Sequence, residues 1–299
     1  MIEEKVLNLE YYKGSDLYSD GDVEDELLTI VTENDSYEDI LKKDTRWPIL
    51  YHLSEVRHNL LEWYNFGKDS SVLEIGAGCG AITGILCKNA GHVTCVELSK
   101  KRSMINARRN KKYDNFEIIV GNFEEIKIDK KFDYVTLIGV LEYAPSYIKS
   151  EKPFDSMLEK IKQYLKPNGK VIIAIENKFG LKYFAGTPED HTGELFDGIN
   201  GYKNIDTVRT FTKNELSKLL EKNGFDGLEF YYPMPDYKMP VQVFSDKYLP
   251  KKGDLRNMVN TYDRDRFALF EEQAVYDQLC EDGMIEYFAN SFLIVGNAK

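Results

Sequence analysis

Short apolar runs alternate with longer amphipathic stretches along most of the chain, and this alternation predicts strands that are separated by helices. Seven runs have the length and composition of buried strands: residues 71–76, 92–97, 116–120, 132–139, 171–176, 228–232 and 291–296. The run at 132–139 is almost continuously apolar, as expected of a strand that is covered on both faces. The pattern therefore predicts a mostly parallel sheet with helices on both faces.

Helical spacing of apolar residues fills the stretches around these strands. It predicts helices over residues 47–66, 81–90, 100–110, 154–165 and 213–223. Ser99 and Thr212 stand where N-cap residues are expected, and Gly224 follows the last of these helices as a terminator. Residues 165–170, with the spacing L-x-P-x-G, predict a tight turn into the strand at 171–176.

Two segments do not follow the alternation. Residues 1 to about 40 are acidic and weakly periodic, so we expect an arm or part of a lid without readable chemistry. We group residues 1–66 as an N-terminal helical extension and residues 67–299 as one domain. Within that domain, residues 233–290 form an insertion with helices expected at 254–260 and 266–281. The insertion would serve as an accessory unit over the substrate mouth or as an oligomer contact.

A glycine-rich turn follows the first predicted strand. The string E-I-G-A-G-C-G begins at Glu74 and places glycines at Gly76, Gly78 and Gly80. Glycines let the backbone turn sharply and let a ligand approach the main chain closely. Glu74 lies near the carboxyl end of the strand, where we expect its carboxylate to face the crevice and to suit a cation rather than a phosphate.

Two nucleotide cofactors fit this turn. Residues 76–81 also read as G-x-G-x-x-A, and Glu97 lies 21 residues after Gly76, near the spacing of a ribose-binding acid in NAD enzymes. A pyrophosphate, however, prefers amide donors and a helix N-terminus without a fixed negative charge. The sulfonium and ammonium groups of S-adenosylmethionine favour an acidic neighbour such as Glu74. We therefore expect S-adenosylmethionine, with an NAD-dependent sugar oxidoreductase as the rival interpretation.

The E-x-G-x-G-x-G string resembles the first motif of class I S-adenosylmethionine-dependent methyltransferases. The L-x-P-x-G turn and the V-L-E-Y segment at 140–143 are similar to further segments of these enzymes, with Tyr143 where relatives carry histidine. The resemblance implies a Rossmann-like, seven-stranded α/β sheet in the order 3-2-1-4-5-7-6. It also implies the cofactor-binding residues Glu74, Gly76, Ala77, Gly78, Gly80, Glu97, Leu98, Asn122, Phe123 and Gly139.

Other strings resemble a bacterial group of methyltransferase domains found with, or fused to, glycosyltransferases of surface-polysaccharide and protein-glycan assembly. They include E-N-K-F-G-L-K-Y at 176–183 and E-D-H-T-G at 189–193. This resemblance implies O-methylation of a sugar or glycan, or of its precursor, with a glycosyltransferase as partner. Two alternatives stay open: N-methylation of an amino sugar or an amino-acid substituent, and a non-catalytic scaffold for a glycosyltransferase.

Methyl transfer to a hydroxyl requires that the hydroxyl lose its proton. His191 is the candidate base because imidazole titrates near neutrality, and Asp190 or Glu189 would orient it. A hydrogen-bond cluster that only orders the loop explains these residues equally well. A cation site built from these three neighbours is disfavoured, because adjacent residues rarely converge on one ion. We therefore expect no metal.

Composition limits the partners. The chain has 299 residues and a net charge of −11, which argues against nucleic acid despite a basic helix at residues 100–112. We expect no membrane span, because the chain has no apolar run of about 18 residues. We expect no signal peptide, because residues 1–5 lack the basic and then apolar pattern. Four cysteines lack metal-ligand spacing, so a cytoplasmic protein is expected. A small-molecule or glycan acceptor and a homo-oligomer fit these limits.

Overall fold

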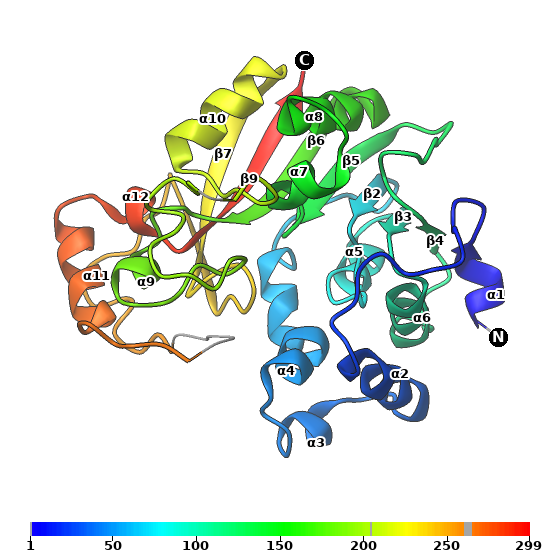
Figure 1. Cartoon of the computed structure of the whole chain (residues 1–299), viewed down its shortest axis with the longest axis horizontal. Coiled ribbons are helices and arrows are strands. Elements are labelled where there is room, and N and C mark those ends of the chain that lie inside the picture. The colour runs from blue at the N-terminus through cyan, green and yellow to red at the C-terminus, as the bar shows by residue number, and fades with distance from the viewer. Residues whose placement is uncertain (1, 204, 260–264) are drawn as a thin grey trace. The chain divides into compact units, whose positions relative to one another are not determined.

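The computed structural model describes residues 2–203, 205–259 and 265–299 (Figure 1). The chain divides into two compact units. Unit 1 comprises residues 1–137 and 163–170, and unit 2 comprises residues 138–162 and 171–299. The predicted division into an extension at 1–66 and a domain at 67–299 stays a prediction.

Unit 1 is built on a parallel sheet in the order β1-β4-β3-β2-β5. Its strands are β1 (Leu7–Asn8), β2 (Ser71–Ile75), β3 (His92–Glu97), β4 (Phe116–Val120) and β5 (Phe132–Ile138). Four of these match runs that the apolar pattern predicts. The register sets Glu74 beside Cys95, and Glu97 beside Val120, so the carboxyl ends of these strands lie together at one edge.

Seven helices belong to unit 1: α1 (Ile2–Val6), α2 (Val23–Glu33), α3 (Glu38–Leu41), α4 (Trp47–Leu53), η1 (Glu55–Leu60), α5 (Thr83–Asn89) and α6 (Lys100–Arg109). Apolar residues of α2 and α4 pack with Cys79 and Ile105 in one buried cluster. The single helix predicted over residues 47–66 is wrong. Ser54 has extended backbone angles and caps the separate 3₁₀ helix η1 by accepting a hydrogen bond from Val56 N at 3.3 Å.

Unit 2 carries four strands in the order β6-β9-β7-β8, although the first six residues of β6 belong to unit 1. They are β6 (Leu165–Glu176), β7 (Phe225–Met234), β8 (Gln242–Ser245) and β9 (Ser291–Ala298). Strand β7 is antiparallel to both β8 and β9. The helices described in unit 2 are η2 (Leu141–Tyr143), α7 (Ala144–Tyr147), α8 (Pro153–Tyr164, which ends in unit 1), α9 (Leu181–Phe184), α10 (Lys213–Lys222), α11 (Glu272–Glu281) and α12 (Ile285–Phe288).

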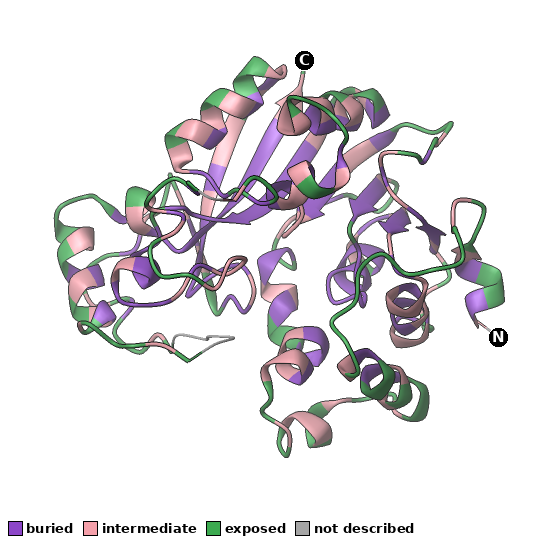
Figure 2. Cartoon of the chain, in the orientation of Figure 1, coloured by how far each residue is buried: buried purple, intermediate pink, exposed green. Residues whose placement is uncertain are grey.

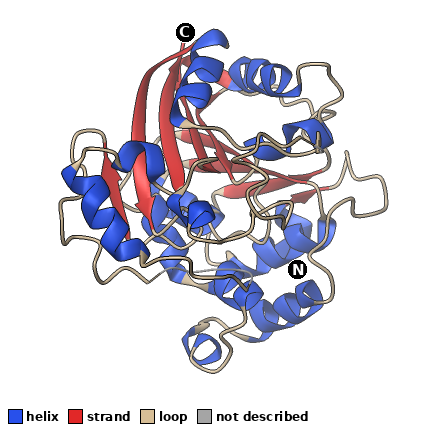
Figure 3. Cartoon of the chain, turned by 60° about the vertical axis from the view of Figure 1, so that its left-hand side comes forward, coloured by secondary structure: helices blue, strands red, loops and turns tan. Residues whose placement is uncertain are grey.

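The fold is Rossmann-like with a mostly parallel sheet, but the described residues form nine strands rather than the predicted seven. The two additional strands, β1 and β8, are short edge strands of two and four residues. Strand β6 also includes the predicted turn at 165–170, where Asn168 keeps a positive φ of 62°. Figure 2 shows that the central strands are largely buried, and Figure 3 shows the helices that flank them.

The predicted helices of the insertion are partly wrong. Residues 252–257 form turns with i to i+3 hydrogen bonds, and residue 260 lies outside the described part of the chain. The helix predicted at 266–281 begins only at Glu272, because Leu269 N donates instead to Ala185 O at 2.9 Å. Across the described ranges, no helix combines the length and the apolar character needed to cross a membrane.

Candidate functional site

The glycine turn of unit 1 follows β2 and needs its glycines for conformation and for space. Gly76, Gly78 and Gly80 have φ values of 72°, 54° and 77°. A Cβ on Gly80 would lie 2.2 Å from Asn106 Oδ1, and Asn110 Nδ2 donates to Gly80 O at 3.1 Å. The Asn106 and Asn110 side chains therefore pack directly against the turn, and the positive φ values favour glycine at these positions.

Glu97 is the last residue of β3 and is buried. Its Oε2 accepts from Gly78 N at 2.7 Å and its Oε1 accepts from Ser99 N at 2.9 Å. Each carboxylate oxygen has a second lone pair, so both remain able to accept from hydroxyls of a ribose. The same side chain thus holds the glycine turn and offers the acceptor expected for an adenosine.

Glu74 lies inside unit 1, which differs from the expectation that it faces a crevice. Pairing of β2 with β3 places it beside Cys95, and its Oε2 accepts from Thr83 Oγ1 at 2.6 Å and from Cys95 Sγ at 3.3 Å. Burial raises the pKa of Glu74 to about 7, although the hydrogen bond from Thr83 opposes the shift. Its contact with a cofactor stays a prediction.

The raised pKa of Glu74 gives a test of this geometry. The pKa of this carboxyl is about 7 in the folded chain and 4.5 in the unfolded chain. Its protonation therefore stabilises the folded state fully below about pH 4.5. That stability, about 3 kcal/mol, is lost as the pH rises through 7. Glu74→Gln imitates the protonated form, so we expect the variant to match the wild type near pH 4.5 and to be more stable at pH 8. Urea unfolding at both pH values measures this, and an equal difference at the two would contradict the assignment.

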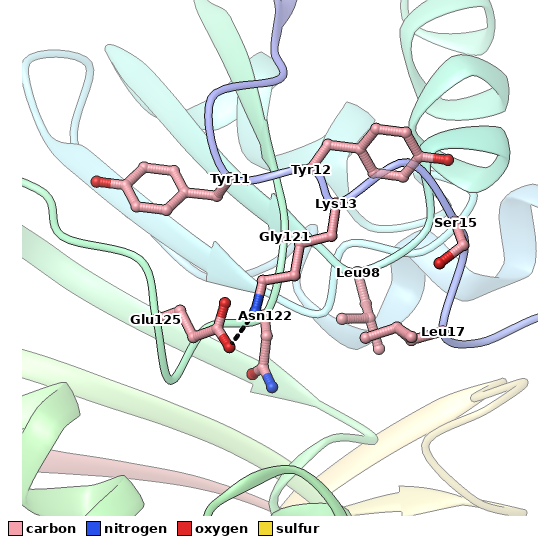
Figure 4. Close-up of a pocket in the computed structure, with 9 residues that line it drawn as sticks. All are labelled: Tyr11, Tyr12, Lys13, Ser15, Leu17, Leu98, Gly121, Asn122 and Glu125. Carbon is pink, nitrogen blue, oxygen red and sulfur yellow. Dashed lines mark hydrogen bonds and ion pairs between the residues drawn. The ribbon is translucent and has the colours of Figure 1, made fainter.

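A small, shallow pocket lies beside the ends of β3 and β4 (Figure 4). Leu98, Gly121 and Asn122 line it together with residues of the N-terminal segment: Tyr11, Tyr12, Lys13, Ser15, Leu17 and the nearby Glu125. Lys13 Nζ pairs with Glu125 Oε1 at 2.6 Å. Leu98 and Asn122 are predicted cofactor residues, and their contact with the adenosine part of the cofactor stays a prediction. Phe123 lies elsewhere, buried against Tyr164.

Sequence patterns gave no sign that the N-terminal segment reaches this pocket. It is fastened by Asp16, whose carboxylate accepts from Lys100 N at 2.7 Å and from Ser99 Oγ at 3.0 Å at the start of α6. Gly121 touches the segment as well, since a Cβ there would lie 2.7 Å from Tyr11 Cβ. The one available signal was the aromatic pair Tyr11 and Tyr12 within a polar stretch.

Gly139 is a predicted cofactor residue that follows β5 and lies in unit 2. Its N donates to Ala174 O at 2.9 Å, and its φ is 71°. A Cβ at this position would lie 2.7 Å from Tyr237 Oη. This predicted cofactor residue therefore needs glycine for two independent reasons.

The His191 cluster consists of Glu142, Glu176, Glu189 and His191. The ring Nδ1 lies 2.9 Å from Glu189 Oε1, and Nε2 lies 3.6 Å from Glu142 Oε1 and 3.8 Å from Glu176 Oε2. Glu189 also accepts from Tyr202 Oη at 3.0 Å and from two backbone N–H groups. Sequence reasoning missed Glu142 and Glu176, which lie just after β5 and at the end of β6.

The charges of the cluster determine the protonation of His191. Burial alone would lower the pKa of the imidazole, but Glu176, Glu142 and Glu189 together raise it well above its usual value. The ring is therefore protonated at neutral pH, and a protonated imidazole cannot accept a proton as a general base. Burial also raises the pKa of Glu142, against the contact with His191.

Asp190 points to different partners from its sequence neighbours. Its carboxylate pairs with Lys182 Nζ at 2.7 Å and with Lys238 Nζ at 2.6 Å, and it also accepts from Tyr183 Oη. These lysines hold the pKa of Asp190 well below its usual range, although burial opposes this. Glu189 contacts the His191 ring, whereas Asp190 joins a buried ion-pair group.

Comparison with known proteins gives a family match for part of the chain. A family described as "Methyltransferase domain" matches residues 73–171. Over 119 residues the chain is 28% identical to malonyl-(acyl-carrier protein) O-methyltransferase of Priestia megaterium, which covers 39% of this chain and 40% of that protein. The chain spans 40 to 66% of the length of the first curated relatives that it matches.

Two solved structures are similar in fold. One is a methyltransferase in complex with the Haloferax volcanii Trm112 methyltransferase activator, with a TM-score of 0.50, 17% identity and coverage of 91% of this chain and 97% of that chain. The other is phosphoethanolamine N-methyltransferase 1 of Haemonchus contortus with S-adenosylhomocysteine, with a TM-score of 0.51, 15% identity and coverage of 92% and 49%. Residues 73–171 therefore form a methyltransferase domain, and S-adenosylmethionine is its cofactor.

Proposed function

We propose that the chain transfers the methyl group of S-adenosylmethionine to a hydroxyl of a sugar or glycan, or of its nucleotide- or lipid-linked precursor. The observation that carries the proposal is the convergence of two strings in unit 2. The string at 176–183 contributes Glu176, and the string at 189–193 contributes Glu189 and His191, to the same buried cluster. Both strings resemble the glycosyltransferase-associated group, so their meeting point is the expected place of its acceptor chemistry.

The position of the cluster on the fold supports this role. Ligands of α/β sheets bind outside the carboxyl ends of the strands. Glu176 is the last residue of β6, and Glu142 follows the end of β5 by four residues. Gly139, Val140 and Tyr143 are partly exposed beside the buried carboxylates, which leaves an approach for an acceptor.

The chemistry of the cluster favours a hydroxyl over an amine. Both oxygens of Glu142 and of Glu176 lack a hydrogen-bond donor among the described residues. A hydroxyl supplies such a donor, and a carboxylate can then accept its proton as the oxygen attacks the methyl group. An amine that arrives neutral attacks without a base, so the N-methylation alternative does not need these residues.

The decisive experiment combines an acceptor screen with one variant. The purified chain is incubated with methyl-labelled cofactor and with sugar nucleotides, lipid-linked sugars and amino sugars, and mass spectrometry locates the label. We expect label on a sugar oxygen, and we expect His191→Gln to abolish transfer while the affinity for S-adenosylmethionine, measured by calorimetry, stays unchanged.

Other outcomes separate the rivals. Label on nitrogen, with transfer retained in His191→Gln, would favour the N-methyltransferase. An absence of transfer to every acceptor, with cofactor bound, would favour the non-catalytic scaffold. Transfer to oxygen that survives His191→Gln would remove this histidine from the mechanism.

A further inference from the structure

We propose that Glu142, Glu176 and His191 form a binding site for one divalent cation of the Mn²⁺ or Mg²⁺ kind. This differs from the expectation of no metal, which concerned the adjacent residues 189–191. The three ligands proposed here come from separate segments: η2, the end of β6, and the loop that contains His191. Side chains from separate segments can converge on one ion without a sharply folded loop.

The distances within the group are those of a site rather than of a hydrogen-bond network. One carboxylate oxygen of each glutamate and one ring nitrogen of His191 all lie within 4.8 Å of one another. Nε2 is 3.6 Å from Glu142 and 3.8 Å from Glu176, which is too long for a hydrogen bond. Ligand atoms around a cation with bonds near 2.1 Å stand roughly 3.0 to 3.4 Å apart, so a cation requires only a small closure of the group.

The two buried carboxylates have unused acceptor capacity. Glu142 and Glu176 are each 0% exposed, and none of their four oxygens has a hydrogen-bond donor in the described chain. Lys238 Nζ lies 3.0 Å from Glu176 Oε1, but this ion pair lacks hydrogen-bond geometry. Buried carboxylates are normally hydrogen-bonded, ion-paired or bound to a metal, because an unpaired buried charge is costly.

The hydrogen bonding of the His191 imidazole resembles that of a metal-binding histidine. Ligating histidines usually donate their second ring N–H to a carboxylate, which orients the ring and sets its tautomer. Nδ1 of His191 meets Glu189 Oε1 at 2.9 Å, and Glu189 is itself fixed by Tyr202 and by the backbone N–H groups of His191 and Thr192. This leaves Nε2 directed at Glu142 and Glu176.

The neighbouring lysines do not neutralise the group. Lys182 pairs with Asp190 at 2.7 Å and with Asp236 at 3.9 Å, whereas Lys238 is shared by Asp190 at 2.6 Å and Glu176 at 3.0 Å. By count of charges, the two lysines offset only the two aspartates. Glu142, Glu176 and Glu189 are left with a single imidazole, so a divalent cation would offset most of the remaining negative charge.

The ligand set indicates the class of cation. Two carboxylate oxygens and one imidazole nitrogen suit Mn²⁺, and carboxylates with additional oxygen ligands suit Mg²⁺, whereas the thiolates that select softer metals do not occur among these three ligands. Three protein ligands leave further coordination positions of the cation for other oxygens.

The role of the cation rests on the proposed function. A hydroxyl oxygen of the acceptor would occupy one of the remaining positions, and the cation would lower the pKa of that hydroxyl. The O–H bond breaks and its proton passes to the oxygen of Glu142 or Glu176 that does not bind the cation, while the hydroxyl oxygen forms a bond to the methyl carbon. The carbon–sulfur bond breaks, and its electron pair goes to sulfur.

Mn²⁺ binding tests the site without any acceptor. The chain is stripped with a chelator and titrated with MnCl₂, and electron paramagnetic resonance measures free Mn²⁺. We expect one Mn²⁺ per chain, at least 100-fold weaker binding in Glu142→Gln and Glu176→Gln, and about 10- to 100-fold weaker binding in Glu189→Gln. Glu272→Gln, which replaces a buried glutamate that pairs with Arg266, should bind Mn²⁺ as the wild type does.

A wild-type chain that leaves the free Mn²⁺ signal unchanged would overturn the proposal and would identify protonated His191 as the cation of the cluster. Because this measurement uses the wild type, it does not depend on whether a variant folds. Its result is also independent of the acceptor, so it separates failure of the site from failure of the proposed function. With an acceptor found, chelation should abolish transfer and MnCl₂ should restore it, and transfer unaffected by chelation would overturn the contact with the hydroxyl.

Discussion

Asp190→Asn should lower the free energy of unfolding by about 3 to 5 kcal/mol, because it removes the shared carboxylate of a buried ion-pair group. Lys182 and Lys238 would then stand close together and would keep the weaker ion pairs of Lys182 with Asp236 and of Lys238 with Glu176. The Lys182 side chain is 3% exposed, so water cannot replace the lost partner. Equilibrium unfolding in urea at pH 7 measures the change.

The matched control is Asp39→Asn, which removes the partner of Lys42 at the surface. Those two side chains are 88% and 69% exposed, and exposed ion pairs contribute little to stability. The control should therefore unfold as the wild type does. If Asp190→Asn were no more destabilising than Asp39→Asn, the buried lysines would have to find other partners.

Glu97→Ala should weaken the binding of S-adenosylmethionine by about 100-fold or more, since hydrogen bonds to a charged acceptor contribute about 1.5 to 3 kcal/mol each. The loss has two sources. The variant removes the acceptor expected for the ribose hydroxyls, and it releases Gly78 N and Ser99 N, which this carboxylate now fixes. Isothermal titration calorimetry measures the affinity.

Glu117→Ala provides the comparison for Glu97. Glu117 lies near the start of β4, at the opposite end of the strand from the glycine turn, and its carboxylate pairs with Lys130 at the surface. Its removal should leave cofactor affinity unchanged. Equal affinities of Glu97→Ala and the wild type would mean that the cofactor does not use the end of β3.

Much of the sheet could be predicted because strands that are buried in a parallel sheet are continuous apolar runs in the sequence. The strands at 92–97 and 116–120 have the bounds that the pattern predicts, and Ser99 caps α6 as expected. The edge strands β1 and β8 were missed because two to four residues are too short to show periodicity. Ser54 divided a predicted helix because capping competes locally with helical spacing.

The candidate site was less predictable, since its contacts join residues that are distant in sequence. Sequence neighbours suggested that Asp190 or Glu189 orients His191, and only the fold separates these roles. Glu142 belongs to the V-L-E-Y segment that resembles methyltransferases. Its proximity to Glu176, however, follows from how the end of β6 packs against the chain after β5. Patterns identify the residues that bear chemistry, whereas tertiary structure decides which of them meet.

The N-terminal segment has a consequence for turnover. Because Tyr11, Tyr12 and Leu17 help to enclose the space beside Leu98 and Asn122, a nucleoside held there touches chain that lies outside the central sheet. The spent, demethylated cofactor would then leave at a rate set partly by these side chains. Product inhibition could therefore change between related enzymes through this segment alone, while the glycine turn and the sheet stay the same.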